Sequence, residues 1–317
     1  MSTQNTKLSV IIPVTDRLDP VKQLFSKYKD AIASTGVDYE FIYVVDGNQK
    51  NALQQLEELA KDEAITVISL AKSFGETTAL NAAFSTASGE IYLTLPAYEQ
   101  IEPAEIPKIL EQLRDSDMVL ARRSPRHDSI LNRAQSATFN ALLRLSTDLH
   151  ISDAGCGVRA FKKEILDEVK LYGDLHRFFP VMAHRQGFKV TEVDTAQADA
   201  DKKLRVYSPG IYLRRLLDIL TIFFLVKFTK KPLRFFGMVG SSVFVIGLLA
   251  NLYIILERII WGVPLADRPA LILSSLLIVL GIQIIAIGLI GEIIIFTHAK
   301  DIKEYKIKNI ISYDKHQ

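Results

Sequence analysis

The stretch "LSVIIPVTDRLDPVKQLFSKYKDAIASTGVDYEFIYVVDGN", from Leu8 to Asn48, decides the fold. It opens and closes with apolar runs rich in Val, Ile and Tyr, which are typical of strands buried on both faces of a parallel sheet. Between these runs, residues 20–34 carry apolar side chains at three- and four-residue spacing, the pattern of an amphipathic helix. The stretch therefore predicts a strand–helix–strand unit.

The same alternation of strand and helix patterns continues to about residue 200. Three further apolar runs have the composition of strands: "ITVISL" (65–70), "EIYLTL" (90–95) and "MVLARR" (118–123). Three further segments have apolar residues at helical spacing: 51–62, 77–88 and 103–116. This order predicts an α/β fold with a doubly wound, mostly parallel sheet. Ligands of such sheets bind beyond the carboxyl ends of the strands, so we expect the functional site there.

The second half of the chain is strongly apolar. Residues 235–256 and 269–291 carry no charge, and each run exceeds the roughly 20 residues that cross a bilayer core of about 30 Å. We therefore expect two transmembrane helices, with two buried helices of a soluble core as the alternative. Neither run contains a charged residue of the kind that marks an ion or substrate pathway, which disfavours a transporter or channel.

Basic residues indicate how these helices are oriented. Lysines and arginines flank the pair on both sides: Lys227, Lys230, Lys231 and Arg234 before it, and Lys300, Lys303, Lys306 and Lys308 after it. The positive-inside rule then places both ends in the cytoplasm and the connecting loop 257–268 outside. The preceding segment 211–228 has charges at helical spacing among apolar residues, which predicts an interfacial helix on the cytoplasmic leaflet, with a third span as the alternative.

These patterns predict four regions: a cytoplasmic α/β domain (1–205), an interfacial region (206–232), two transmembrane helices (233–298) and a basic cytoplasmic tail (299–317). The net charge of +2 gives no sign of a nucleic-acid partner. Cys156 is the one cysteine, which excludes an intrachain disulfide and fits a reducing compartment. The first residues, "MSTQNTKLSV", lack the apolar core of a signal peptide, so we expect the first domain to stay in the cytoplasm.

Eight segments spread over nearly the whole chain carry a family resemblance: "SVIIPV" (9–14), "YEFIYVVDGN" (39–48), "LAKSFGETTALNAAFSTASGE" (70–90), "DMVLARRSPR" (117–126), "DAGCGVRAFKKEIL" (153–166), "HRFFPVMAHRQGFKVTEV" (176–193), "RVYSPGIY" (205–212) and "GLIGEIIIFTHAKDIKEYKI" (288–307). Their order and spacing resemble the family 2 glycosyltransferases of the polyprenyl-phosphate, dolichol-phosphate mannose synthase-like type. The resemblance implies a GT-A-like domain followed by two membrane helices. It also implies transfer of a sugar from a nucleotide sugar to a polyprenyl phosphate at the inner (plasma) membrane, for cell-envelope glycan assembly by a homo-oligomer.

The resemblance also assigns residues to ligands. The family positions at the nucleotide correspond to Pro13, Val14, Thr15, Asp46, Gly47 and Ser73. Those at the phosphates and the acceptor correspond to Arg123, Arg126, Asp153, Arg159, Arg177, Arg205 and Tyr212. Simpler alternatives stay open: Asp46 as a turn former, Asp153 as a cap, and the arginines as packed or solvated surface charges.

One family motif is replaced in this chain. The resemblance implies Mg²⁺ or Mn²⁺, held by an Asp-x-Asp motif after the fourth strand, to neutralise the leaving diphosphate. The two acids fall on Pro96, which has no ligand atom, and on Tyr98, whose phenol is a poor ligand for a hard cation. Gln100 and Glu99 remain as candidate metal ligands. Further departures from the family pattern stand at Val45, Ser73 and Ile211.

These departures leave two hypotheses. An active enzyme would hold a metal with Asp46, Gln100 and a glutamate, or would use arginines in place of metal. A pseudoenzyme would keep the fold and the arginines, and would bind a lipid-linked intermediate or a partner enzyme. Convergence of Glu99 or Glu102 and Gln100 with Asp46 on one cleft would favour the metal, whereas a cleft filled by Tyr98 would favour the pseudoenzyme.

Overall fold

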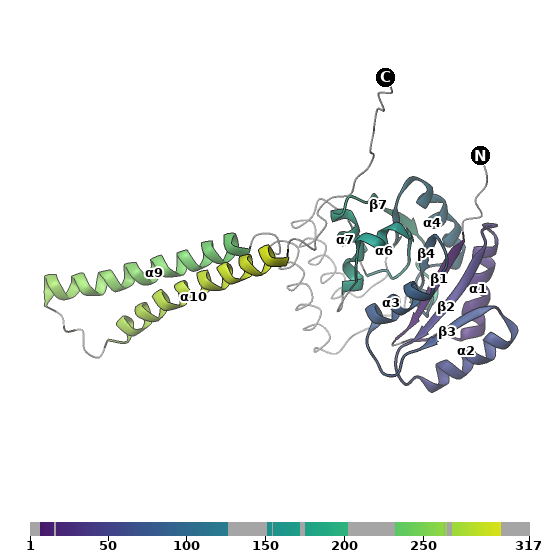
Figure 1. The fold of residues 1–317 in the computed structure, drawn as a ribbon, viewed down its shortest axis with the longest axis horizontal. Coiled ribbons are helices and arrows are strands. Elements are labelled where there is room, and N and C mark those ends of the chain that lie inside the picture. Colours follow the sequence, from purple (N-terminus) through teal and green to yellow (C-terminus); the bar gives the residue numbers. More distant parts are fainter. Residues whose placement is uncertain are drawn as a thin grey trace, which may run out of the picture. The chain divides into compact units, whose positions relative to one another are not determined.

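The computed structural model describes residues 7–15, 17–125, 151–153, 155–171, 175–201, 232–262, 264 and 268–298. These residues form two compact units, an α/β unit within 7–201 and a pair of long helices within 232–298 (Figure 1). Each unit is described by itself. The predicted interfacial helix 211–228 and the basic tail from Lys300 onward lie outside the described residues.

The α/β unit contains a 7-stranded sheet with helices packed on it (Figure 1). The strands are β1 (Leu8–Val14), β2 (Tyr39–Val45), β3 (Ile65–Ser69), β4 (Ile91–Thr94), β5 (Met118–Arg123), β6 (Arg159–Lys162) and β7 (Val190–Thr195). The helices are α1 (Val21–Ala33), α2 (Lys50–Asp62), α3 (Glu76–Thr86), α4 (Ile106–Gln112), α6 (Glu164–Glu168) and α7 (Phe179–Arg185). Short 3-10 turns stand at η1 (Pro103–Glu105), η2 (Leu113–Asp115), η3 (Leu175–Phe178) and η4 (Asp199–Asp201). The five predicted strands and the four predicted helices are confirmed, the last of these helices as α4 with a 3-10 turn at each end.

The strand order brings four strand ends to one edge of the sheet. The order is β3-β2-β1-β4-β6-β5-β7, with β6 antiparallel to both neighbours and the other pairs parallel. In register, Val14 lies beside Val45, and Thr94 lies beside both Ile11 and Arg159. Because β6 is reversed, it begins where β4 ends. The carboxyl ends of β1, β2 and β4 therefore meet the start of β6.

The core of this unit lies around β1, which is buried along its whole length. Helix α1 contributes a buried face to the same core, and the two largest side chains of that face are Phe25 and Tyr28. The Phe25 ring meets the Phe41 ring edge-to-face with centroids 5.0 Å apart, an arrangement that stabilises by about 0.5–1.5 kcal/mol beyond the area it buries. Strand β3 stands at the edge of the sheet, so its residues are half-buried or exposed rather than buried on both faces.

A polar cluster joins the start of β2 to its neighbours. The Glu40 carboxylate accepts hydrogen bonds from Ser9 Oγ at 2.6 Å, from the Ser88 backbone nitrogen at 2.8 Å and from Lys7 Nζ at 3.0 Å. Burial alone would raise the pKa of Glu40, but these hydrogen bonds lower it from 4.5 to about 2. The ionised form of Glu40 is therefore the form that stabilises the fold.

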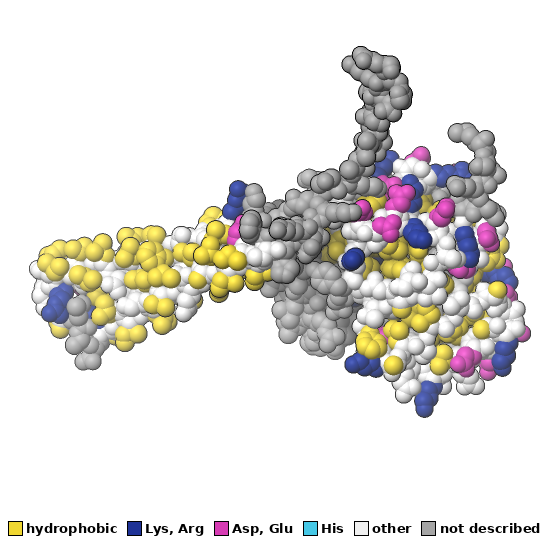
Figure 2. All heavy atoms as spheres, viewed as in Figure 1, with side chains coloured by type: hydrophobic (Ala, Val, Ile, Leu, Met, Phe, Trp, Pro, Cys, Tyr) yellow, Lys and Arg dark blue, Asp and Glu magenta, His cyan; other side chains and the backbone are white. Residues whose placement is uncertain are grey.

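The second unit is an antiparallel pair of helices, α9 (Pro232–Trp261) and α10 (Pro269–His298). In the most apolar part of each helix, 17% and 11% of the residues are buried, and apolar side chains cover the outside of the pair (Figure 2). Helices in the core of a soluble protein are mostly buried, so this exposure argues against that alternative. Both helices are long and apolar enough to cross a membrane.

Small residues let α9 and α10 approach each other closely. A Cβ atom added to Gly281 would lie 2.6 Å from the Phe244 backbone nitrogen, and one added to Gly247 would lie 2.8 Å from the Ile278 backbone nitrogen. Between these helices the Asn251 amide also donates to the hydroxyls of Ser274 and Ser275 at 3.2 Å. Close backbone approach and polar contacts of this kind hold helices together where apolar surface faces lipid.

We predict that Gly281→Leu separates the helix pair, because a side chain there meets the backbone of α9. Overpacking of this kind costs about 1–3 kcal/mol. Gly237→Leu is the matched control, since the nearest atom to a Cβ at that glycine is 3.9 Å away. The measurement is unfolding of the helix pair in mixed micelles. Equal loss of stability in the two variants would contradict the packing described here.

We predict that Glu40→Gln removes part of the acid sensitivity of the α/β unit. The pKa of Glu40 is lower in the folded chain than its ordinary value of 4.5. Its stabilisation is therefore complete above pH 4.5 and is lost as the pH falls toward 2. The midpoint temperature of thermal unfolding, measured on the detergent-solubilised protein, should fall more steeply as the pH is lowered through this window in the original protein than in the variant. Parallel curves for the two proteins would show that the carboxylate has no such role.

Candidate active site

A small cleft opens at the edge where the four strand ends meet. It is lined by residues from the ends of β1 and β4, the start of β6 and the first turn of α3, among them Pro13, Thr94, Pro96, Gly157, Glu76 and Arg159. Glu76 and Arg159 are the charged members of this lining. The cleft thus lies at the edge predicted for the functional site, and it presents one carboxylate and one guanidinium.

Asp46 joins the end of β2 to the loop before α3. Its carboxylate accepts hydrogen bonds from the backbone nitrogens of Phe74 at 2.7 Å and Gly75 at 2.9 Å and from the Ser73 hydroxyl at 2.9 Å. Gly47 follows with φ 82°, and a Cβ there would lie 2.9 Å from the Ser73 backbone nitrogen. These contacts go beyond the turn-forming role that was the simpler alternative for Asp46.

The Gln49 amide closes this part of the edge by donating to the carbonyls of Val14, Thr15 and Asp46. The residues predicted at the nucleotide are therefore brought together at the ends of β1 and β2: Pro13, Val14, Thr15, Asp46, Gly47 and Ser73. Their role in binding a nucleotide stays a prediction.

The segment after β4 is held by a buried tyrosine. Tyr28 of α1 lies with its hydroxyl 3.2 Å from the carbonyl oxygens of both Pro96 and Tyr98. The Gln100 amide donates to the Tyr98 hydroxyl at 2.9 Å and accepts from the Gly157 backbone nitrogen at 2.8 Å. Burial, with the nearby carboxylates of Asp201 and Glu76, raises the pKa of Tyr98. The phenol therefore stays protonated, which makes it a still poorer ligand for a divalent cation.

Glu99 turns away from this group. Its carboxylate pairs with Lys27 Nζ of α1 at 2.6 Å, and its backbone nitrogen donates to the Asp19 carboxylate at 3.2 Å. The structure thus does not bring Glu99 together with Gln100 and Asp46. Among the described residues no three His, Cys, Asp or Glu side chains are arranged to hold a metal ion. Within the part of the chain that the structure describes, the side chains after β4 do not fit the cation that the family motif would bind.

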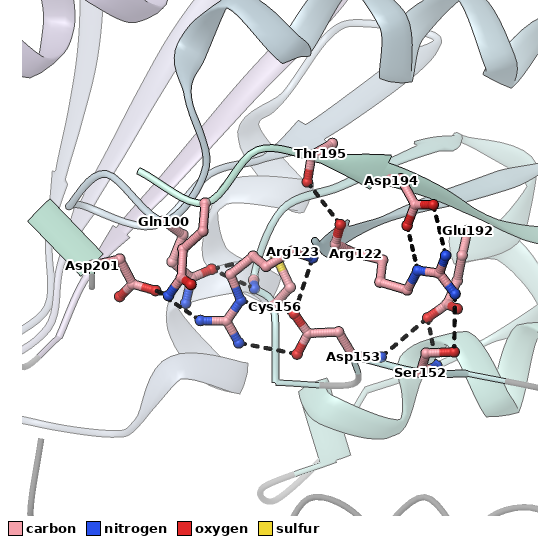
Figure 3. A network of polar contacts seen from close by, with 12 residues as sticks. Gln100, Arg122, Arg123, Ser152, Asp153, Cys156, Glu192, Asp194, Thr195 and Asp201 are labelled. Atoms are coloured by element: carbon pink, nitrogen blue, oxygen red, sulfur yellow. Dashed lines mark hydrogen bonds and ion pairs between the residues drawn. The ribbon is translucent and has the colours of Figure 1, made fainter. Parts of the chain in front are cut away.

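Arg123 stands at the centre of a buried network (Figure 3). Its Nε and NH2 atoms donate to Asp153 at 2.7 and 3.0 Å, and its NH1 atom donates to Asp201 at 2.8 Å. Burial would lower the pKa of Arg123, but these carboxylates raise it above its ordinary value. Arg123 and Asp153, both predicted at the phosphates and the acceptor, bind each other. Three of the Arg123 nitrogens donate to two carboxylates inside the protein, those of Asp153 and Asp201. Their contact with a ligand stays a prediction.

The structure also shows two functional candidates that the sequence analysis did not single out, Glu76 and His176. The His176 ring lies between the Glu76 carboxylate, 3.2 Å from Nε2, and the Thr77 hydroxyl, 3.0 Å from Nδ1. Arg159 donates to the His176 carbonyl oxygen. Burial would raise the pKa of Glu76, but His176 and then Arg159 and Arg177 lower it. An ionised carboxylate and a guanidinium thus share the cleft.

The remaining predicted site residues divide into two groups. Arg177 is exposed on η3. Three lie outside the described residues: Arg126, Arg205 and Tyr212. A signal for the missed pair was present, because Glu76 opens the helix after "SFG" and His176 opens "HRFFP", both inside segments that carry the resemblance.

We predict that Tyr28→Phe destabilises the protein and that Tyr43→Phe does not. Loss of the Tyr28 hydroxyl leaves the carbonyls of Pro96 and Tyr98 without this donor, which should cost about 1–3 kcal/mol. The Tyr43 hydroxyl is buried with no hydrogen-bond partner among the described residues, so its removal should be neutral or stabilising. Denaturant unfolding of the two variants checks this. Equal destabilisation would refute the assignment of Tyr28 as the residue that holds this segment.

Known proteins share this architecture. The model of the family described as "Glycosyl transferase family 2" matches residues 9–170, just over half of the chain. A glucosyl-3-phosphoglycerate synthase from Mycobacterium tuberculosis, solved with Mn²⁺, uridine diphosphate and phosphoglyceric acid, has a TM-score of 0.51 at 14% identity. The match covers 69% of this chain and 78% of that chain. At this identity it shows the fold alone and confirms the predicted GT-A-like α/β architecture.

Two relatives match over nearly their whole length. The undecaprenyl-phosphate 4-deoxy-4-formamido-L-arabinose transferase of Proteus mirabilis is 30% identical over 315 residues, covering 98% of this chain and 95% of the relative. The dodecaprenyl-phosphate galacturonate synthase of Rhizobium johnstonii is 27% identical over 305 residues, covering 94% of this chain and 90% of the relative. The family match and the full-length similarity confirm the resemblance seen in the sequence. The chain belongs to glycosyl transferase family 2.

Proposed function

We propose that the protein transfers a sugar from a nucleotide sugar to a polyprenyl phosphate, for cell-envelope glycan assembly. One observation carries this proposal: the similarity to the two relatives, both named for a polyprenyl phosphate, extends through the cleft-bearing α/β unit and the apolar helix pair together. An enzyme with a soluble acceptor would not need the helix pair. A lipid acceptor explains why a cleft and membrane-type helices occur in one chain.

The two charged residues of the cleft suit this chemistry. In the reaction, an oxygen of the acceptor phosphate bonds to the anomeric carbon, the bond from that carbon to the donor diphosphate breaks, and a nucleoside diphosphate leaves. The acceptor is already an anion, so no strong general base is needed. We assign to Arg159 the binding of a phosphate oxygen, because a guanidinium forms charge-assisted hydrogen bonds with phosphate. Glu76, which stays ionised, is suited to accept a hydrogen bond from a sugar hydroxyl.

The location of the protein follows from the same proposal. We propose the inner (plasma) membrane, with α9 and α10 as its two spans, the α/β domain (1–205) in the cytoplasm, an interfacial region (206–232) and a basic cytoplasmic tail (299–317). Basic residues flanking the helix pair support this orientation. Assembly into a homo-oligomer is part of the proposal and is tested by the mass of the purified protein in detergent.

A second candidate function is favoured by the residues after β4. Pro96 and Tyr98 replace both acids of the family's metal motif, and Glu99 is paired with Lys27. A protein that no longer transfers sugar could still bind a lipid-linked intermediate or a partner enzyme. Metal-dependent binding of a nucleotide by the original protein would exclude this candidate, and so would any lipid-linked product.

The test is transfer by the purified full-length protein in detergent. Undecaprenyl phosphate is incubated with a panel of labelled nucleotide sugars, with Mn²⁺ and with EDTA in separate reactions, and lipid-linked label is measured. We predict product with at least one donor. Arg159→Lys should lower kcat by about 10- to 100-fold, because lysine keeps the charge and loses the planar fork that binds phosphate.

Arg185→Lys is the control for this variant, since Arg185 is exposed at the end of α7 and is not one of the residues that line the cleft. It should retain full transfer. Absence of lipid-linked label with every donor, in either condition, would reject transfer and leave the second candidate function.

A further inference from the structure

Tyr98, which replaces the second acid of the family's metal motif, makes several contacts with its surroundings. Tyr98 is contacted from two further directions besides the Tyr28 hydroxyl on its carbonyl. Gln100 binds its hydroxyl, and the guanidinium of Arg17 lies over its ring with Cζ 4.5 Å from the ring centroid. A tyrosine face attracts a guanidinium through its electron-rich ring. The residue that stands in place of a metal-binding acid thus holds a cation of the protein itself.

Arg17 is also fixed from its own loop. Its Nε and NH2 atoms donate to Asp19 at 2.8 and 3.1 Å, whereas NH1 has no hydrogen-bond partner among the described residues. The Asp19 carboxylate accepts in addition from the Glu99 backbone nitrogen, and the Asp19 nitrogen donates to the Ala97 carbonyl oxygen at 2.9 Å. These bonds join the loop after β1 to the segment after β4. One edge of the Arg17 guanidinium is therefore held and the other is open.

The other guanidiniums near the cleft are less exposed than that of Arg17. Arg123 is 8% exposed and donates to two carboxylates. Arg159 is 7% exposed and donates to the His176 carbonyl oxygen. The Arg17 side chain is 29% exposed. It combines a fixed position at the ends of β1 and β4 with a donor edge that a ligand can reach.

We propose that Arg17, held on the ring of Tyr98, contacts the diphosphate of the nucleotide donor in place of a divalent cation, so that nucleoside diphosphates bind this protein without metal. The inference rests on the proposed function, because that function supplies the nucleotide. A metal in this place needs hard oxygen ligands such as carboxylates, and the side chains at positions 96 and 98 offer no carboxylate. A guanidinium presents parallel N–H donors that match phosphate oxygens, and it carries a charge at every physiological pH.

The ring of Tyr98 suits this role better than a carboxylate would. Arg17 already pairs with one carboxylate, that of Asp19, and a second carboxylate at position 98 would give it two, the number that Arg123 has in Asp153 and Asp201. An aromatic face positions the guanidinium without adding this second negative charge. Asp19 supplies the rest of the positioning, and its own charge is shared with the Glu99 backbone nitrogen.

The test is calorimetry on the full-length protein in detergent, with UDP, GDP, CDP, ADP and dTDP as probes. We expect at least one of them to bind in EDTA, with a Kd that Mn²⁺ changes by less than about threefold. Arg17→Gln should weaken that diphosphate by about 10- to 100-fold, the range for hydrogen bonds to charged groups. The matching nucleoside should bind the variant and the original protein equally, because it has no phosphate.

Further variants separate charge from structure. Tyr98→Leu, which removes the ring, should weaken the diphosphate more than Tyr98→Phe, which keeps it. The diphosphate affinity of Arg17→Lys should lie between that of Arg17→Gln and that of the original protein. Arg17→Lys also serves as the second variant if Arg17→Gln does not fold. Arg114→Gln, at an exposed position on η2, is the control and should leave binding unchanged.

The outcomes distinguish this inference from the proposed function. Two results would overturn the role of Arg17 and leave the transfer proposal intact. One is diphosphate binding that Mn²⁺ tightens tenfold or more, and the other is an equal loss of nucleoside and diphosphate affinity in Arg17→Gln. Binding in EDTA without any lipid-linked product would support the role of Arg17 and overturn the transfer proposal. Failure of every probe to bind in either condition would overturn both.

Discussion

The parallel pairing of β1 with β2 and β4 is the constraint on which the rest of the α/β unit depends. Because these strands run parallel, their carboxyl ends lie at one edge of the sheet, and the loops beyond them expose backbone groups there. Three side chains satisfy these groups. The buried Asp46 binds the nitrogens before α3, the half-buried Gln49 binds the carbonyls after β1, and the buried Tyr28 lies within hydrogen-bond distance of the carbonyls after β4. An unpaired buried backbone group costs free energy comparable to a lost hydrogen bond. The edge is therefore an ordered surface before any ligand arrives.

Two arginines near this edge differ: Arg123 is buried in internal ion pairs, and Arg17 is partly exposed. Arg123 satisfies Asp153 and Asp201, so its charge is balanced inside the protein and contributes chiefly to joining β5 to two later segments. Such buried pairs are costly to break, because removing one partner leaves an uncompensated charge. Arg17 differs, since an aromatic ring carries part of the positioning that carboxylates carry for Arg123. The difference between a buried arginine paired with two carboxylates and a partly exposed one paired with a single carboxylate cannot be read from residue type.

The sequence predicts the fold closely where burial leaves a pattern. The first five strands and four helices follow from apolar runs and helical spacing, and both membrane-type helices follow from length and lack of charge. Strands β6 and β7 were not predicted, because "RAFK" and "VTEVDT" are short and mixed in polarity, and the sheet rather than local sequence makes them strands. The site was harder. The replaced acids at positions 96 and 98 are evident from the resemblance, but the pairing of Arg123 with Asp153, the approach of His176 to Glu76 and the stacking of Arg17 on Tyr98 join residues far apart in the chain.

The replacement of the metal motif therefore does not by itself decide between an active enzyme and a relic. A position released from function would be expected to lose its fixed partners, yet Tyr98 keeps contacts from α1, from the loop after β1 and from Gln100. Restoring acids at positions 96 and 98 would also not restore a metal site directly. A carboxylate at position 98 would lie near Arg17 and Arg123 as well as near Asp201 and Glu76, so two guanidiniums would compete with a metal ion for it. At this edge a proline and a tyrosine stand where the family has carboxylates, with Arg17 over the tyrosine ring, and the chemistry of the site depends on these groups rather than on the missing motif.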